Sequence, residues 1–490
     1  MSTEVEPTVV KTGPSVLRRQ VPDEVVQSIT SDEYKELRLM TDMREPFRIP
    51  AEFLLTTKKR AAADLGTTPL IAFFDLSEDK PVDVLRALWA NLKTREAEGD
   101  LLAGHIRRNL RILAAGGDGT VTWILKSIFD LGLDPPPSVA VMPLGTGNDL
   151  SLSFGWGNAF KNKWLSGAQL YRTLGRYVEA QPRALDAWRI TLVGPGPELF
   201  DHLPHSLAAL DDGAAAAAAA GPEPPAAATG PEAERAAAAV GPTAPGQRHA
   251  AVGGMFWNYF SVGLDAQAAY GFHALREAHG WAASTRLANQ AWYSYFSCSS
   301  GWFCGASPLK NRVRLRGRGG PGGEAWRDVP VPSSVRAIVV LNLQSYGGGR
   351  DIWGLAEAGR GGEVTPIFAD GLVEVVGFRD GWHTALVMGQ LSAKVHAERI
   401  AQLAELEITL HPTGRAAVKD EEGQTFMQLD GEPWPQLIPP AKAEPLRVRI
   451  SRAGTSSMLM NASDAQGPPK IKKLAKRGAE KAPVLRPKKD

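Results

Sequence analysis

The sequence predicts an α/β domain with a parallel sheet, followed by a β-rich domain that resembles an antiparallel sandwich. Two observations predict this fold class. Between residues 69 and 142, short apolar blocks alternate with amphipathic helical patterns, which is typical of parallel strands joined by crossover helices. Beyond residue 255, apolar and polar residues alternate one by one, which is typical of antiparallel strands with one solvated face.

Length and composition limit the class of protein. The chain has 490 residues, enough for two to four domains, and its 43% hydrophobic content supports sizeable cores. Its formal net charge of +2 gives no overall attraction to nucleic acid, so we expect no nucleic-acid partner. Two cysteines exclude a disulfide scaffold and favour a cytosolic setting. No apolar run approaches the roughly 20 residues of a membrane-spanning helix, so we expect a cytoplasmic protein that associates peripherally with membranes.

The first half of the chain is expected to form its elements in the following order. Residues 1–60 mix charge and proline and form a loosely ordered lead-in. Three short apolar blocks then predict buried parallel strands, at residues 69–74, 110–115 and 138–142. Helical patterns lie between them, with apolar residues at Val84, Leu85, Leu88 and Leu92, and at Val121, Ile124, Leu125 and Ile128.

A segment of low complexity interrupts the chain before the second half. Residues 211–246 are mostly Ala, Pro and Gly and contain no aromatic residue, so we expect a disordered insert with no core of its own. After it, strand patterns predict the β-rich domain, at residues 335–343, 372–378, 406–410 and 446–450.

The loop Gly116-Gly117-Asp118-Gly119-Thr120 follows a predicted strand and opens a predicted helix. Glycines let the backbone approach a phosphate closely, and a helix N-terminus attracts anions. Because an Asp at this place repels phosphate, the loop favours a nucleotide bound with Mg²⁺. The alternative is a tight turn with an Asp cap.

A second glycine-rich loop follows the third predicted strand, with Gly145, Thr146, Gly147, Asn148 and Asp149 in the run Pro-Leu-Gly-Thr-Gly-Asn-Asp-Leu. Both loops therefore lie at the carboxyl ends of parallel strands, where open α/β sheets bind ligands. Together they indicate a site for ATP phosphates and a metal.

These two loops resemble the catalytic domain of diacylglycerol kinases. Further motifs resemble the accessory domain of the same family, and they occur in the expected order: residues 258–266, 270–273, 342–349 and 430–434. Residues 154–157, 301–304 and 381–383 resemble the plant-type branch. No Cys/His zinc-finger pattern precedes the catalytic region in this sequence, so we expect no diacylglycerol-sensing C1 module.

The resemblance implies phosphorylation of diacylglycerol to phosphatidic acid, with ATP as phosphate donor and Mg²⁺ bridging its phosphates. It implies that Asp430 accepts the hydroxyl proton, with Glu432 beside it, and that Asp118 organises metal or phosphate. Relatives also assign the base role to the Asp of the first loop, here Asp118, so the division of roles stays open. Asp149 is a further candidate Mg²⁺ ligand. The alternative interpretation of Asp430-Gly431-Glu432 is a turn that closes a strand.

The sequence departs from the family where the first strand ends. The family has a Ser-Gly-Gly loop there, but this chain has the acidic residues Asp75, Glu78 and Asp79. Either a segment is missing from the sequence at this place or nucleotide binding is weakened, and the second case implies a catalytically weakened pseudokinase. A related lipid kinase acting on a sphingoid base or ceramide is a further alternative.

The expected organisation has five parts. They are an N-terminal extension (1–65), the catalytic domain (66–190), a low-complexity insert (191–250), the accessory domain (251–455) and a basic tail (456–490). Residues 470–490 hold nine Lys or Arg and two acidic residues. Because cations favour anionic membranes, this tail is a candidate for binding anionic lipid.

Overall fold

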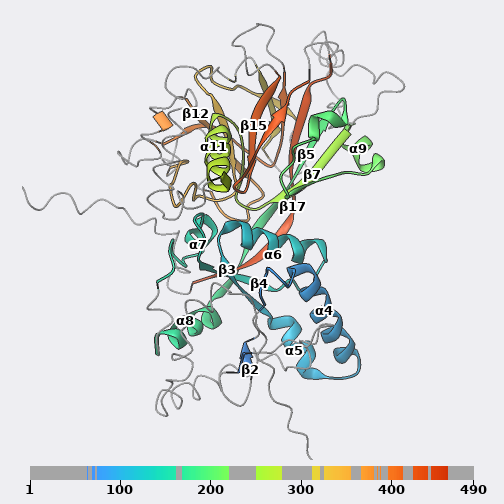
Figure 1. Ribbon diagram of the computed structural model, residues 1–490, viewed down its shortest axis with the longest axis vertical. Helices are drawn as coiled ribbons and strands as arrows, with labels where there is room; N and C mark the ends of the chain where they lie inside the picture. The colour runs from blue at the N-terminus through green and yellow to red at the C-terminus, as the bar shows by residue number, and fades with distance from the viewer. Residues whose placement is uncertain are drawn as a thin grey trace, which may run out of the picture.

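The computed structural model forms two lobes joined by long strands (Figure 1). It describes residues 63–64, 69–71, 74–161, 168–219, 250–278, 309, 312–319, 325–354, 366–379, 383–384, 387, 396–411, 423–439 and 443–461. In Figure 1 the lower lobe carries most of the labelled helices, and the upper lobe carries most of the strands. This arrangement confirms the predicted α/β part and the predicted antiparallel β-rich part.

The lower lobe is an α/β unit. Its elements are α4 (Pro81–Ala97), α5 (Leu101–Asn109), β3 (Arg111–Gly116), α6 (Asp118–Asp130), β4 (Ser138–Pro143), α7 (Asp149–Ser153) and α8 (Ala168–Glu179). β3 and β4 are parallel, in register from Arg111 opposite Ser138 to Gly116 opposite Pro143. The apolar stripes of α4 and α6 are buried against this pair, as their 3.6-residue spacing predicts.

The prediction for the first strand is wrong in its pairing. β2 (Pro69–Ile71) pairs antiparallel with β1 (Ala63–Asp64) and does not join β3 and β4. An apolar run indicates burial but does not specify which neighbour a strand takes. The next residues also fold back at once, because the amides of Glu78 and Asp79 both donate to the Asp75 carbonyl. Residues 75–79 therefore form a compact acidic turn directly before α4.

A nine-stranded sheet connects the lobes. The path of hydrogen-bonded neighbours runs β10–β9–β14–β17–β5–β7–β6, and the parallel pair β3–β4 joins it where Val139 of β4 meets Met458 of β17. These strands are β5 (Gln181–Gly194), β6 (Leu207–Ala209), β7 (Ala250–Phe256), β9 (Val313–Arg318), β10 (Arg327–Val329), β14 (Glu405–Leu410) and β17 (Leu446–Met460).

A six-stranded antiparallel sheet completes the upper lobe, in the order β13–β12–β11–β8–β15–β16. It comprises β8 (Tyr259–Gly263), β11 (Ala337–Leu341), β12 (Val373–Phe378), β13 (Glu398–Leu403), β15 (Gln424–Leu429) and β16 (Glu432–Leu437), with α11 (Leu264–Ala278) packed on β15 and β16. Apolar residues of both sheets, such as Phe260, Ile408 and Val448, share one core. The sandwich prediction is therefore confirmed.

Three of the expected domain boundaries fall inside strands, one of them after Ala250, the first residue of β7. β5 runs through residue 190, and β17 runs through residue 455 to Met460. The two strands pair with each other along nearly their whole length, from Arg447 opposite Val193 to Met460 opposite Gln181. Because one strand serves both lobes, a change in local sequence pattern does not mark the boundary between them.

The predicted insert is ordered at its start. The short helix η4 (Pro197–Phe200) and β6 lie within it, and α9 (Asp212–Ala219) covers the end of β5 and β7. There Ala215 packs with Val193 and Ala251 in a small core, so the expectation of disorder is wrong for these residues. Alanine has the highest helix propensity, and a neighbouring sheet supplies the apolar partner that the segment itself lacks.

Several expectations lie outside the described residues. They concern residues 1–62 of the N-terminal extension, residues 220–249 of the insert and the basic residues 470–490. Among the described helices, none has the length and apolar character needed to cross a membrane.

Candidate active site

Asp118 stands at the start of α6, directly after the end of β3. Its carboxylate Oδ2 accepts the backbone N–H of Asp149 at 2.8 Å, and its Oδ1 accepts that of Leu150 at 3.0 Å. These N–H groups belong to the first two residues of α7. The first N–H groups of any helix have no partner within the helix. Asp118 thereby joins the first glycine-rich loop to the start of the helix that follows the second loop.

The two glycine-rich loops touch each other through glycine backbones. A Cβ added to Gly145 would lie 2.3 Å from the Gly117 Cα, and one added to Gly117 would lie 2.9 Å from the Gly147 carbonyl oxygen. The Asp118 amide also donates to that carbonyl, at 3.0 Å. Glycine at 117 and 145 is thus required for packing between the loops. The sequence predicts glycine at these positions for contact with phosphate, a role that packing does not test.

The outer side of the first loop is open. A Cβ added to Gly119 would meet no atom within 4 Å, whereas Gly116 is packed against the Thr120 side chain. Gly119, Thr146 and Gly147 are all exposed, so the two loops present backbone and one hydroxyl to solvent at the start of α6. A helix N-terminus with open backbone beside it is suited to phosphate.

The buried side chain of Asn148 stabilises the second loop through hydrogen bonds. Its Nδ2 donates to the carbonyls of Gly145, at 2.7 Å, and Asn158, at 3.0 Å. Through these bonds the buried side chain holds the loop in shape. The contact of Asn148 with nucleotide stays a prediction.

Asp149 connects the two lobes. Its Oδ1 accepts the Ser345 hydroxyl at 2.5 Å and the Gly349 amide at 2.9 Å, and the Gly348 amide lies 3.0 Å from both carboxylate oxygens. Gly348 and Gly349 have positive φ angles of 92° and 100°, which lets consecutive amides point at one acceptor. These contacts make Asp149 a clamp between the lobes, and its role as a Mg²⁺ ligand stays a prediction.

Asp430 lies at the tip of the β15–β16 hairpin, in a left-handed conformation with φ of 47°. Its Oδ2 accepts the Trp257 amide at 2.9 Å, while its Oδ1 accepts the Asn258 amide at 2.9 Å and the Tyr259 amide at 3.0 Å. The prediction of a turn that closes a strand is thus correct, and it is compatible with a chemical role. Three amides orient the carboxylate, and Oδ2, which accepts only one of them, keeps a lone pair for another partner.

Glu432 follows Asp430 but has a different environment. Its Oε2 accepts the backbone N–H of Ser206 at 3.0 Å, which ties the hairpin to the segment before β6. Its charge raises the pKa of Asp430, so the two carboxylates are electrostatic neighbours. This contact supports a positioning role for Glu432 more than a role in proton transfer.

Two of the carboxyls predicted to act in catalysis, Asp118 and Asp430, have raised pKa values. Burial raises the pKa of Asp118 to about 8; the negative charges of Asp149 and Asp430 add to this, while the amides of Asp149 and Leu150 oppose it. Burial raises the pKa of Asp430 to about 7, against the effect of its three amide donors. The charge of Asp430 also raises the pKa of Asp118, so these carboxyls of different lobes are electrostatic neighbours.

The donor set fits a Mg²⁺ held largely by substrate. Among the described residues, no three His, Cys, Asp or Glu side chains gather as a ready metal cage. Mg²⁺ in kinase sites is usually bound through one or two carboxylates together with substrate phosphates. Asp118, beside the open side of the loops, fits that requirement.

Sequence reasoning missed the residues that hold the carboxylates in place. They are Ser206, Trp257, Ser345, Leu150 and the amides of Gly348 and Gly349. Most of these contacts use backbone amides, which any residue type supplies. Only the glycine run at 347–349 gave a signal, because successive glycines indicate unusual backbone angles.

Comparison with known proteins supports a single family. Residues 87–174 match the diacylglycerol kinase catalytic domain, and residues 255–433 match the diacylglycerol kinase accessory domain. Diacylglycerol kinase 4 of Arabidopsis thaliana is 39% identical over 376 residues, which cover 74% of this chain and 70% of that protein. Diacylglycerol kinase 1 of Oryza sativa subsp. japonica is 36% identical, over 75% of this chain and 69% of that protein.

More distant proteins match as well. Human diacylglycerol kinase zeta is 29% identical over 74% of this chain and 31% of its own length. Among solved structures, a putative diacylglycerol kinase from Bacillus anthracis str. Sterne is 13% identical with a TM-score of 0.35, over 72% of this chain and 79% of that one. With both domain matches in order and plant relatives covered over most of their length, this chain belongs to the diacylglycerol kinase family.

Proposed function

We propose that this protein transfers the γ-phosphate of ATP to the free hydroxyl of a diacylglycerol and releases phosphatidic acid and ADP. The observation that carries the proposal is the pair Asp118 and Asp430, which come from different lobes and lie close enough for the charge of one to raise the pKa of the other. The open glycine loops at the start of α6 lie beside Asp118.

In the proposed reaction, Asp430 accepts the proton of the acceptor hydroxyl. The hydroxyl oxygen then forms a bond to the γ-phosphorus, and the bond from that phosphorus to the bridging oxygen of ADP breaks. A pKa of about 7 suits a general base at neutral pH, because the group is ionised in part and still takes up a proton readily. The three amides that donate to Asp430 fix the orientation of its carboxylate.

Asp118 and the glycine loops position the donor. Phosphoryl transfer depends mainly on positioning and on neutralising charge. Mg²⁺, when bound, would supply that neutralisation, with Asp118 as its protein ligand. The amides at the start of α6 and the exposed backbone of the second loop would bind the phosphates.

The substrate places the protein at a membrane surface. Diacylglycerol resides in the bilayer, so we propose peripheral association, with the basic tail at residues 470–490 as one contact to anionic lipid. The charge of the tail supports this proposal, since nine basic residues face two acidic ones.

One observation favours a weakened enzyme as the second candidate. The catalytic-domain match begins at residue 87, inside α4, and so leaves out the acidic turn that stands where the family has Ser-Gly-Gly. Asp75, Glu78 and Asp79 would repel the phosphates of ATP if they lay near them. A pseudokinase of this kind would keep the lipid site and lose nucleotide binding.

The test is phosphate transfer by the purified full-length chain. Diacylglycerol, sphingosine and ceramide are each offered in micelles with Mg²⁺ and labelled ATP, and Asp430→Asn serves as the inactive variant. Labelled phosphatidic acid from the unchanged chain alone supports the proposal. Transfer only to sphingosine or ceramide favours the related lipid kinase, and no transfer together with no ATP binding by calorimetry favours the pseudokinase.

A further inference from the structure

The outward face of the nine-stranded sheet carries arginines on three of its strands. Residues paired across antiparallel strands lie on the same face, and successive residues alternate between faces. Arg316 of β9 pairs with Glu407 of β14, which pairs with Arg449 of β17. The residues next to them, such as Leu315 and Val448, are buried in the core between the sheets. The arginines therefore point away from that core, and we call this set the arginine face: Arg189, Arg314, Arg316, Arg318, Arg447 and Arg449.

The arginine face has an excess of positive charge. Its acidic residues on the same strands and on β10 are Asp328, Glu405 and Glu407, so the six arginines leave a net charge of +3. Ion pairs join Arg314 to Asp328 at 2.9 Å and Arg449 to Glu407 at 3.6 Å. Exposure differs across the face, since the Arg314 side chain is 47% exposed and that of Arg449 is 24% exposed. Arg189 on β5 is also exposed.

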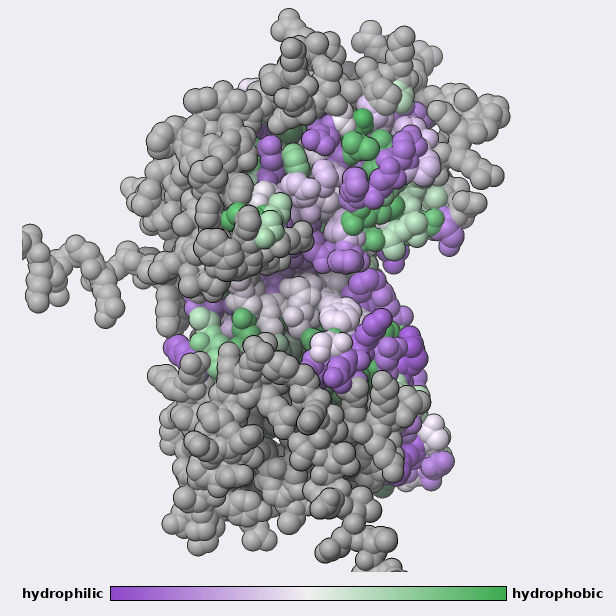
Figure 2. Space-filling model, in the orientation of Figure 1, coloured by the Kyte–Doolittle hydropathy of each residue, from purple (hydrophilic) through white to green (hydrophobic). Residues whose placement is uncertain are grey.

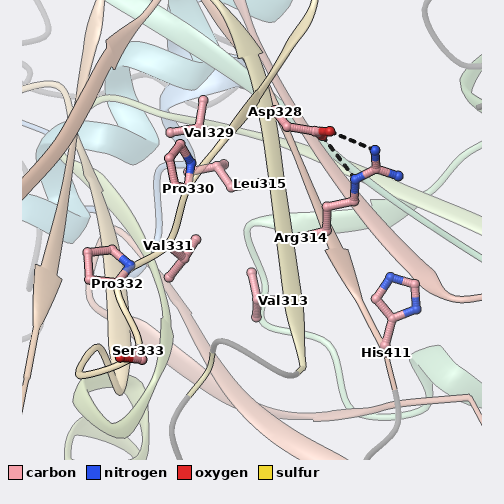
Figure 3. Close-up of a pocket in the computed structure, with 10 residues that line it drawn as sticks. All are labelled: Val313, Arg314, Leu315, Asp328, Val329, Pro330, Val331, Pro332, Ser333 and His411. Carbon is pink, nitrogen blue, oxygen red and sulfur yellow. Dashed lines mark hydrogen bonds and ion pairs between the residues drawn. The ribbon is translucent and has the colours of Figure 1, made fainter. Parts of the chain in front are cut away.

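A shallow pocket adjoins the arginine face at the β10 edge. It has a volume of about 620 Å³. Figure 3 shows the aliphatic and prolyl side chains Val329, Pro330, Val331 and Pro332 toward one side, and the Arg314–Asp328 pair with His411 toward the other. The surface thus combines guanidinium groups with an accessible apolar hollow. Hydrophobic and hydrophilic side chains also lie side by side over the described part of the upper lobe in Figure 2.

We propose that the arginine face and the pocket beside it form a docking surface for membranes that contain anionic phospholipid. The proposal rests on the proposed function, because the substrate and product of that function are both lipids. Arginine suits this partner, since its planar guanidinium binds phosphate oxygens in pairs and is more weakly hydrated than an ammonium group. Apolar side chains beside cations are the combination found in segments that lie at the membrane interface.

Vesicle flotation without ATP and without diacylglycerol tests the surface separately from catalysis. The full-length chain is mixed with vesicles of phosphatidylcholine alone or of phosphatidylcholine with phosphatidylserine. The variants are Arg314→Gln, Arg189→Gln and the double change, and Arg86→Gln is the control, because Arg86 is an exposed arginine on α4 that pairs with Asp83. Thermal unfolding of each variant verifies that the fold is kept.

We expect binding to the mixed vesicles to fall about fivefold for each arginine lost on the face and to stay unchanged for Arg86→Gln. Added salt should reduce the difference, because it screens exposed charges. Val331→Asn should weaken the part of the binding that survives in high salt. Equal binding by the double variant and the unchanged chain would overturn the proposal, whether the face then binds a protein or nothing.

Failure of the kinase proposal gives a different result. A chain that shows the expected vesicle binding but makes no phosphatidic acid would retain the docking surface and lose the proposed function. A chain that phosphorylates a short-chain, water-soluble diacylglycerol equally well with and without the arginine changes would show that the face acts on membrane access and not on the chemistry.

Discussion

Asp118 and Asp430 are both carboxyls held by backbone amides, yet they are built in different ways. Asp118 starts a regular helix, and its two oxygens satisfy the first amides of another helix in the same lobe. Asp430 lies in a hairpin turn with a positive φ angle. Its three amide donors are the consecutive residues Trp257, Asn258 and Tyr259, which lead into the start of β8 in the upper lobe. The first arrangement joins the two glycine-rich loops, and the second orients a single carboxylate.

This difference indicates that the carboxyls of the proposed site are divided between the two lobes. Each lobe supplies one carboxyl, and the contact of Asp149 with the turn at Ser345, Gly348 and Gly349 holds the lobes together beside them. Changes at Asp118, Asp430 and Asp149 should therefore separate donor binding, chemistry and lobe contact.

The largest expected effect is on turnover by Asp430→Asn. We expect kcat to fall by about 10²- to 10⁴-fold, because the amide cannot accept the hydroxyl proton. Asparagine tolerates the left-handed backbone, so the turn should survive. Mg-ATP binding by calorimetry should stay unchanged in this variant and weaken in Asp118→Asn.

Asp370→Asn is the matched control for that comparison, because its carboxylate also accepts backbone amides in a turn and its pKa is raised by burial. An Asp430→Asn variant that keeps most of its turnover would contradict the assignment of the base.

The next effect is on stability, through the contact between lobes. Asp149→Ala leaves the Ser345 hydroxyl and two glycine amides without their acceptor, and buried groups of this kind cost about 1–3 kcal/mol each. We expect the free energy of unfolding in urea to fall by about 3 kcal/mol. Ser345→Ala removes one hydrogen bond and should cost about 1 kcal/mol; an equal loss in both variants would contradict the clamp.

Two glycines separate packing from ligand approach. Gly145→Ala places a Cβ 2.3 Å from the Gly117 Cα, so it should destabilise the protein by about 1–3 kcal/mol. Gly119→Ala meets no atom within 4 Å and should leave stability unchanged or raise it by up to about 1 kcal/mol. Its added methyl group should nevertheless raise the KM for ATP. An unchanged KM would show that phosphate does not approach Gly119.

A smaller effect is expected in the pH dependence of stability. The folded-state pKa values of Asp118 and Asp430 are raised, so their contribution is present in full near pH 4 and is lost as the pH rises through about 7 and 8. Thermal unfolding without nucleotide should show Tm falling across this window. Asp118→Asn should reduce the slope, and an identical slope in this variant would contradict the raised pKa of Asp118.

Much of the fold could be predicted from the sequence because its signals are local. The apolar spacing of Val121, Ile124 and Ile128 and the alternation at Leu406 and Ile408 follow directly from side-chain geometry in helices and strands. The pairing of residues 69–71 with 63–64 could not be predicted, since an apolar run does not specify the strand with which it pairs. The helix at residues 212–219 depends on Val193 and Ala251, which a compositional argument does not include.

The site shows the same limit. The sequence indicated Asp118 and Asp430 through motifs, but the amides that hold them belong to Leu150, Trp257 and Tyr259, whose side chains carry no information about that contact. The sequence predicts a metal ligand at Asp149 because it is an acid in a glycine-rich loop. Its partner Ser345 is 196 residues away in the chain, so the clamp appears only in the folded protein.

The pH dependence of kcat tests the central claim most directly, namely that Asp430 accepts the acceptor's proton. With saturating Mg-ATP and diacylglycerol, log kcat should rise with pH and level off near pH 7, where the Asp430 carboxyl becomes ionised. Asp118→Asn should keep this rise at lower overall turnover. A kcat that is constant from pH 5 to pH 9, or whose rise disappears in Asp118→Asn and persists in Asp430→Asn, would contradict the account.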